Sequence, residues 1–479
     1  MSTLDDKAVD RHSDCAGLFL DERWDDPAAL RGEIYTAERL TEHAADVARA
    51  HGAPSLAVPA GPLRARIVAA RGRIREAYTT LAREAEKHRD SSPAEEWLLD
   101  NSHIVEEQLR EIEEDLPWGY LIKLPRIGKG PMAGYPRVYG LCLDYLRHTD
   151  ARVELENLSA YVLRYESVSP LTIGELWAIP IMLRLGLILV VGALAVSEAT
   201  ARERARGDDW ADRLLAAGTN PKDVATVLVE LERDEGTLTP FFLVQLIRRL
   251  REHETSSDST FEWIAARCAK MHTTPEELTR KHHLRQAADQ LSVGNAITAM
   301  RVVGAFAWNQ FFEATSFVEK ILWNDPAGAY RASDESSRDR CRHAVEAISR
   351  RCPLDECAVA TRALSLAEEG AKSHPDDPAR AHVAYYLVDE GRRVLDASVH
   401  YRPPIGRRVT RALVDHGKSF YFGLLGAGTV GFTALAREHL AARGARGVEL
   451  ALLILLAVML SSEIAVALIN GLVVAVLPP

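Results

Sequence analysis

The sequence predicts an all-α protein, with a multi-helix cytoplasmic body followed by two transmembrane helices. Apolar residues recur at helical spacing through most of the 479 residues, and helix-capping signals precede several of these segments. Two long, nearly uncharged stretches lie near the C-terminus. Alternating strand patterns bounded by tight turns are missing from the sequence. The composition, 47% hydrophobic and 26% charged, is that of an ordinary large globular protein.

The N-terminal residues 1–60 are acidic and interrupted by prolines, which indicates a loosely ordered extension with one or two short helices. A long helix is expected from Pro62, because proline suits the first helical turn. Its apolar stripe consists of Leu63, Ile67, Ile74, Tyr78 and Leu81. We assign residues 1–90 to this extension and residues 91–405 to a cytoplasmic all-helical domain.

Helical patterns fill the second domain. Ser92, Asn220 and Thr274 each precede a proline and read as helix N-caps. The expected helices are 93–116, 135–148, 154–167, 171–206, 208–217, 221–235, 239–254, 258–271, 275–291, 307–324, 334–351, 354–373 and 377–399.

The most apolar of these helices could be either a membrane span or a buried helix of the core. Only 13 uncharged residues lie between Arg184 and Glu198, whereas a transmembrane helix needs about 20 apolar residues. The stretch Leu171–Ala205 is therefore predicted to be a buried central helix. An interfacial helix is the alternative.

The C-terminal residues 406–479 are predicted to form a two-span membrane segment. The expected spans are 419–436 and 450–477, and Glu463 is the one charged residue inside the second. The residues before the first span are basic, which predicts a cytoplasmic N-terminus by the positive-inside rule. These residues are Arg402, Arg407, Arg408, Arg411 and Lys418.

Residues with recognisable chemistry are scarce, and we predict no catalytic, cofactor-binding or metal-binding residues. The acids of WLLDNSHIVEEQLREIEEDLPWGY (residues 97–120) are interpreted as the polar face of a helix rather than a paired-carboxylate site. Asp100 and Asn101 stand apart from them as candidates for capping or a contact to GYPRVYG. The glycine pattern of Gly423–Gly431 lies inside a predicted span, where it favours helix packing over nucleotide binding.

Metal and nucleic-acid binding are also disfavoured by the sequence. None of the six cysteines forms a CxxC pair, and the adjacent His282 and His283 have no cysteine pair nearby, so a zinc site is not expected. The formal net charge of −10 argues against nucleic acid as a partner.

Several long motifs resemble the N-terminal region of the cyclic β-1,2-glucan synthases, in the same order along the chain. They are residues 97–120, GYPRVYGLCLDYLRHTD, VSPLTIGELWAIPIMLRLGLI, WNQFFEATSFVEKILWNDPAGAYRASDESSRDRCRHAVEAIS and AYYLVDEGR. The resemblance implies a multi-pass protein of the bacterial inner membrane. It also implies a separate transferase domain that uses UDP-glucose and Mg²⁺ or Mn²⁺, together with phosphorylase-like modules; no motif of those parts is present here.

The resemblance therefore predicts an N-terminal segment that scaffolds or regulates a glycosyltransferase and is not catalytic by itself. Its implied partners are the membrane, a transferase domain downstream or in trans, and the growing glucan. The alternatives are an independent membrane-tethered helical interaction protein and, less favoured, an all-α glycosidase. The glycosidase would need facing acids beside aromatic sugar platforms, which no motif provides.

Overall fold

The computed structural model describes residues 32–55, 58–61, 63–86, 93–115, 118–130, 132–194, 198–218, 220–234, 238–253, 258–404, 416–444 and 446–476. Within these ranges, helices are the regular elements, accompanied by two isolated β-bridges at Ser55–Arg126 and Arg126–Pro136. The predicted all-α class is confirmed. The chain divides into two compact units, residues 1–333 and 334–479, while the predicted domain limits after residues 90 and 405 stay predictions.

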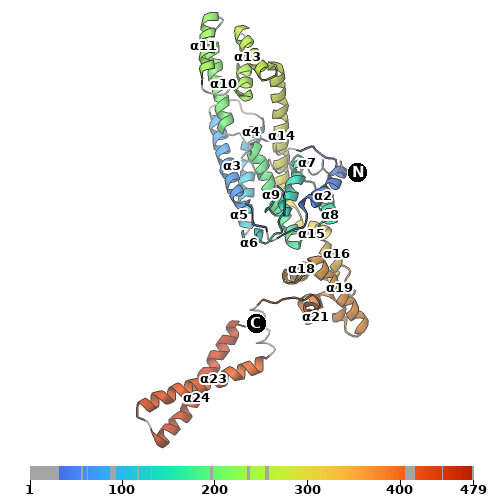
Figure 1. Cartoon of the computed structure of the whole chain (residues 1–479), viewed down its shortest axis with the longest axis vertical. Coiled ribbons are helices and arrows are strands. Elements are labelled where there is room, and N and C mark those ends of the chain that lie inside the picture. Colours follow the sequence, from blue (N-terminus) through green and yellow to red (C-terminus); the bar gives the residue numbers. More distant parts are fainter. Residues whose placement is uncertain are drawn as a thin grey trace. The chain divides into compact units, whose positions relative to one another are not determined.

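The first unit contains most of the helices, and Figure 1 labels all of them except α12 and α17. They are α2 (Ala37–His51), α3 (Leu63–Glu86), α4 (Pro93–Asp100), α5 (Ser102–Asp115), α6 (Trp118–Leu121), α7 (Arg137–His148), α8 (Leu155–Glu166), α9 (Ile173–Leu194), α10 (Glu198–Ala216), α11 (Pro221–Arg233), α12 (Pro240–Arg251), α13 (Asp258–Lys270), α14 (Pro275–Ala305), α15 (Trp308–Thr315), α16 (Phe317–Leu322) and α17 (Ala329–Ala332).

Helix α9 forms the centre of the main core of this unit. It packs against α3, α5, α7 and α14. In Figure 1 the labels of these four helices lie around that of α9. Its apolar stretch is long enough to cross a membrane, yet 78% of that stretch is buried by the chain's own helices. The helix therefore does not need lipid to bury its apolar surface, which agrees with its prediction as a central core helix.

A second core lies around α12, which packs between α10 and α14. Its buried side chains come from α10 to α14 and include Trp210, Leu228, Phe242, Ile247 and Ile264. The caps predicted for two of these helices are present. Asn220 accepts a hydrogen bond from the Lys222 amide, and Thr274 accepts one from the Glu277 amide. Ser92, the third predicted cap, lies outside the described residues.

Several predicted helices have different limits in the structure. The 171–206 helix ends at Leu194, and α10 begins at Glu198 and continues through the range predicted as 208–217. The 93–116 helix is interrupted at Asn101, where the Asn101 side-chain amide donates to the Trp97 carbonyl at 2.8 Å. Because that side chain caps the preceding turn, the backbone starts a new helix at Ser102.

Helix α14 is longer than predicted, since it continues from residue 291 to Ala305. The additional turns contain Gly294 and Asn295, which are poor helix formers. Their neighbours Val293, Ile297 and Met300 are fully buried, and α14 packs along α9. Packing against α9 thus overrides the weak local propensity.

The second unit contains α18 (Glu335–Ser349), α19 (Glu356–Ser373), η2 (Pro378–Ala381), α20 (Val383–Val388), α21 (Arg392–Ser398), α23 (Gly417–Ala442) and α24 (Gly447–Val476). The predicted 377–399 helix is thus three short helices. Asp377 caps η2, and Arg392 holds the turn before α21 by donating to the Leu387 carbonyl at 2.6 Å. These polar contacts replace the continuous helix that the apolar spacing suggested.

Helices α23 and α24 pack against each other as a hairpin. By length and composition, Lys418–Ala442 and Leu450–Gly471 could each cross a membrane. The buried side of α24 consists of Ser461, Ala465 and Ile469, spaced four residues apart. Glu463 is exposed, so it does not face α23.

One glycine allows α23 and α24 to come close. A Cβ atom at Gly428 would lie 3.2 Å from the Ala465 Cβ atom, whereas one at Gly426 would meet nothing within 4 Å. The Tyr421 hydroxyl also donates to Asn470 Oδ1 at 3.2 Å. Of these two glycines, therefore, only Gly428 takes part in helix packing.

Replacing Gly428 by leucine is expected to push the two helices apart, at a cost of about 1–3 kcal/mol, because the added side chain has no room against Ala465. Cross-linking of a Tyr421→Cys/Asn470→Cys pair in membranes measures this, and its yield should fall. Gly426→Leu is the matched control and should leave the yield unchanged. Equal losses in both variants would contradict the assignment.

Candidate functional site

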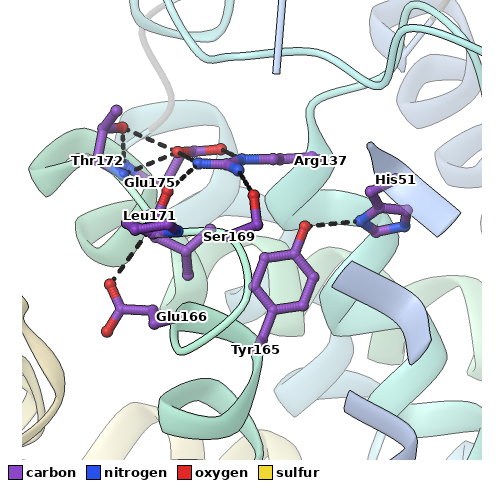
Figure 2. A network of polar contacts seen from close by, with 9 residues as sticks. His51, Arg137, Tyr165, Glu166, Ser169, Leu171, Thr172 and Glu175 are labelled. Carbon is purple, nitrogen blue, oxygen red and sulfur yellow. Dashed lines mark hydrogen bonds and ion pairs between the residues drawn. The ribbon is translucent and has the colours of Figure 1, made fainter. Parts of the chain in front are cut away.

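The best-defined polar site in the first unit is an ion pair between Arg137 and Glu175, which Figure 2 shows from close by. Arg137 begins α7, and Glu175 lies in the first turn of α9. The guanidinium Nε donates to Glu175 Oε1 at 2.6 Å, and one terminal nitrogen donates to Oε2 at 2.7 Å. Both side chains are almost completely buried, at 1% and 0% exposure. This bidentate geometry is the strongest that an arginine and a carboxylate form.

The first turn of α9 holds Glu175 in place. The Thr172 amide and hydroxyl donate to Glu175 Oε2 at 2.9 and 3.0 Å, and the Glu175 amide donates to the Thr172 hydroxyl at 3.2 Å. This reciprocal arrangement is a capping box, which the spacing Thr-x-x-Glu produces at helix N-termini. The carboxylate therefore caps α9 and binds Arg137 at the same time.

The remaining donors of Arg137 are used by the turn before α9. One terminal nitrogen donates to the Ser169 hydroxyl at 2.7 Å, and the other donates to the Pro170 carbonyl at 2.6 Å. Burial lowers the pKa of Arg137, but the adjacent Glu175 carboxylate outweighs it and leaves the pKa raised. The guanidinium thus remains charged and joins α7 to the α8–α9 turn.

Glu166, at the end of α8, is a buried carboxyl close to this ion pair. Its Oε1 accepts a hydrogen bond from the Leu171 amide at 3.3 Å, while its Oε2 is buried without a hydrogen-bond partner. Burial raises the pKa of Glu166 to about 8, and the Leu171 amide and the charges of Lys320 and Arg137 only partly oppose this. The group is therefore largely protonated at neutral pH.

Tyr165 extends the network toward α2. Its hydroxyl lies 2.9 Å from His51 Nδ1, and the two rings meet edge to face. Burial raises the pKa of Tyr165, so the hydroxyl keeps its proton. The network thus connects four helices of the first unit: α2, α7, α8 and α9 (Figure 2).

A second buried carboxylate, Glu319, organises the short helices that follow α14. The Tyr330 hydroxyl and the Trp323 indole each donate to Glu319 at 2.9 Å, and the Glu319 amide donates to the Ser316 hydroxyl at 3.2 Å. Ser316 and Glu319 have the same capping-box spacing as Thr172 and Glu175. The acid is therefore fixed by aromatic donors at the end of the first unit.

The acidic stretch at residues 97–120 behaves mostly as a polar helix face. Glu106, Glu107 and Arg110 are exposed, and Ile104 and Ile112 are buried. Glu111 differs, because it lies 3.2 Å from Arg184 of α9. The side chains of residues 113–118 lie outside the described part of the chain.

The polar pair Asp100 and Asn101 does not act together. Asp100 is exposed, whereas Asn101 is buried and accepts a hydrogen bond from Arg301 of α14 at 2.8 Å. Asn101 therefore caps α4 as expected and contacts α14. Its described side-chain hydrogen bonds go to Trp97 and Arg301, and not to the GYPRVYG turn that the sequence suggested.

Within the described residues, one cluster of side chains could hold a metal ion. It consists of His43, Asp144 and His148, whose ligand atoms all lie within 4.8 Å of one another. Two of the three ligands are imidazoles. This set does not match the oxygen ligands and waters that Mg²⁺ prefers, so it does not fit the Mg²⁺ implied by the resemblance for a transferase domain.

The Arg137–Glu175 pair could not be found from periodicity, since 38 residues separate the two side chains. One sequence signal was present: Thr172 and Glu175 have the spacing of a capping box before an apolar run. Both partners lie in motifs that carry the resemblance, GYPRVYG and VSPLTIGELW. The ion pair thus joins two such motifs in space.

A comparison with curated proteins finds a relative. The chain is 30% identical over 343 residues, which is 71% of its length, to cyclic β-(1,2)-glucan synthase NdvB of Rhizobium meliloti. The match spans 12% of the length of that protein. No protein-family model matches the chain. Over most of its length, this chain is therefore related to the cyclic β-(1,2)-glucan synthases.

Proposed function

We propose that this chain is a helical, membrane-anchored region of a cyclic β-1,2-glucan synthase, and that it supports glucosyl transfer without catalysing it. In this proposal a transferase domain outside these residues takes UDP-glucose with Mg²⁺ or Mn²⁺. The chain lies in the bacterial inner membrane with its N-terminus in the cytoplasm and corresponds to the N-terminal side of such a synthase. The sequence relationship to NdvB carries the proposal.

The chemistry of the buried acids supports a structural role. Glu175 is occupied by Arg137 and the Thr172 cap, and Glu319 by Tyr330 and Trp323. A general acid or base needs an oxygen within reach of a substrate proton. These carboxylates instead bind neighbouring helices, as expected for a rigid support.

The C-terminal helices support the membrane part of the proposal. Helices α23 and α24 pass the length and composition test for membrane spans, and the sequence before α23 is basic. The hairpin would hold the helical units next to the cytoplasmic face. Substrate and acceptor would then meet on the transferase domain at that face.

Two measurements test this function. Membranes that contain only this chain, supplied with UDP-[¹⁴C]glucose and divalent metal, should incorporate no label above membranes without the chain. Removing residues 93–333 from the protein in its host should strongly reduce cyclic β-1,2-glucan. Label incorporation by the chain alone would disprove the non-catalytic role.

The host experiment also distinguishes the alternative function. An independent membrane-tethered interaction protein would leave cyclic β-1,2-glucan at its normal level when residues 93–333 are removed. The matched control is a variant that alters only exposed acids of α5, Glu106→Gln/Glu107→Gln, which should keep normal glucan.

A further inference from the structure

His43, Asp144 and His148 form a compact cluster between α2 and α7. His43 Nε2 lies 3.0 Å from Asp144 Oδ2, and His148 Nε2 lies 3.7 Å from Asp144 Oδ1. Asp144 and His148 are four residues apart on α7, so both side chains lie on the same face of that helix. Tetrahedral zinc ligands are separated by about 3.4 Å, given metal–ligand bonds of about 2.0–2.2 Å. The two spacings to Asp144 bracket that value, and all three ligand atoms lie within 4.8 Å of one another.

The orientation of His148 is the second observation that indicates a ligand. Its Nδ1 lies 2.7 Å from the Glu33 carbonyl oxygen, and a carbonyl can only accept, so Nδ1 carries the proton. In the neutral ring, Nε2 then presents a lone pair toward the Asp144 carboxylate. The distance of 3.7 Å from this nitrogen to Asp144 Oδ1 is beyond hydrogen-bonding range. Two acceptors facing each other is an arrangement that a cation stabilises.

Neighbouring aromatic residues hold the other parts of the cluster. The Tyr161 hydroxyl donates to Asp144 Oδ2 at 2.8 Å. The Tyr35 ring stacks on His148, with centroids 4.2 Å apart and planes 6° from parallel. Backbone and hydroxyl partners that orient metal ligands in this way are typical of metal sites.

The cluster is enclosed but reachable. The side chains of His43, Asp144 and His148 are 15%, 12% and 7% exposed. These exposures give solvent access to the cluster, and an ion held by the three side chains would take a water as its fourth ligand, as in an open zinc site.

From this geometry we propose that His43, Asp144 and His148 bind a borderline divalent cation of the Zn²⁺ class. Two imidazole nitrogens and one carboxylate oxygen match the ligand preference of Zn²⁺ rather than that of Mg²⁺ or Ca²⁺. Without metal, the 3.0 Å contact between His43 Nε2 and Asp144 Oδ2 places a proton on that nitrogen. On binding, the His43 proton leaves to solvent and its Nε2 lone pair binds the ion.

The ion would join α2 to the rest of the first unit. His43 belongs to α2, Asp144 and His148 belong to α7, and Tyr161 belongs to α8. Glu33, which orients His148, precedes α2. Metal binding should therefore fix α2 and the segment before it against α7 and α8, independently of whether the chain supports glucosyl transfer.

The test uses the whole chain in detergent, freed of metal with a chelator and titrated with Zn²⁺ against a competing chromophoric chelator. Wild type should bind one equivalent, and proteolysis near residues 37–51 should slow by about tenfold or more when Zn²⁺ is present. His43→Ala and His148→Ala should each weaken binding by at least about 100-fold. His343→Ala, which removes an exposed histidine 3.1 Å from Asp339, is the matched control and should bind like wild type.

Asp144→Asn distinguishes loss of metal binding from loss of folding. Asparagine keeps the shape of the side chain and the acceptor for Tyr161, and it removes the charge. It should retain the helical circular dichroism of wild type in chelator and lose high-affinity Zn²⁺. Binding of Co²⁺ gives an independent readout, since tetrahedral ligation produces visible absorption bands. Unchanged Zn²⁺ affinity in folded His43, Asp144 and His148 variants, or no stoichiometric Zn²⁺ in wild type, would overturn the proposal.

Discussion

Arg137→Met should lower the free energy of unfolding of the first unit by about 3–5 kcal/mol, because it leaves the Glu175 carboxylate buried without its partner. The variant also removes the donors for the Ser169 hydroxyl and the Pro170 carbonyl. Pulse proteolysis in urea measures this loss, since it reports the fraction of molecules in which the unit has opened.

An exposed arginine–glutamate pair in the same unit provides the matched control. Arg39 contacts Glu33 through two hydrogen bonds, of 2.8 and 3.1 Å, but the side chains are 50% and 60% exposed. Exposed pairs contribute up to about 1 kcal/mol. Arg39→Met should therefore shift the urea midpoint only slightly.

The double variant Arg137→Met/Glu175→Leu separates the ion pair from the cost of leaving one charge unpaired. Apolar replacement of both partners removes the buried charge, so the double variant should be more stable than Arg137→Met alone. It still loses the capping box with Thr172, which is worth about 1 kcal/mol. If Arg137→Met shifted the urea midpoint as little as Arg39→Met does, the buried pair would not hold α7 and α9 together.

The helices themselves could largely be predicted from the sequence because their determinants are local. Four of the five predicted stripe residues are buried in α3, and Tyr78 is half-buried; the four are Leu63, Ile67, Ile74 and Leu81. Thr274 caps α14 at the expected position. Caps and apolar spacing depend on neighbours within one or two turns, so they are visible in a single sequence.

The sites could not be predicted in this way because they depend on contacts between distant segments. Asn101 interrupts a predicted helix and accepts from Arg301, which lies 200 residues further along the chain. His43 meets Asp144 and His148 only because α2 packs against α7 and α8. No spacing rule connects such residues, and the cysteine spacing that indicates a zinc site carries no signal for a histidine–aspartate cluster.

Glu166 shows how burial changes an ordinary acid. In an unfolded chain its carboxyl ionises near its usual pKa of 4.5, whereas in the folded protein the pKa is raised to about 8. Between these values the folded state holds a proton that the unfolded state has released. Its stability therefore falls as the pH rises from about 4.5 to about 8, and is lowest above that range.

Glu166→Gln should remove this pH dependence, because the amide is uncharged and its oxygen can still accept from the Leu171 amide. The difference in unfolding free energy between variant and wild type should grow in favour of the variant by on the order of 4 kcal/mol between pH 4.5 and pH 8. Pulse proteolysis in urea at several pH values measures that difference.

The comparison between variant and wild type cancels the other titrating groups, including the histidines of the first unit. Glu156→Gln is the matched control, since Glu156 is an exposed carboxyl on the same helix, and its stability should follow that of wild type at every pH. A parallel pH dependence of Glu166→Gln and wild type would show that Glu166 is ionised in the folded protein. Its Oε2 would then need a donor from outside the described contacts, because those contacts give it none.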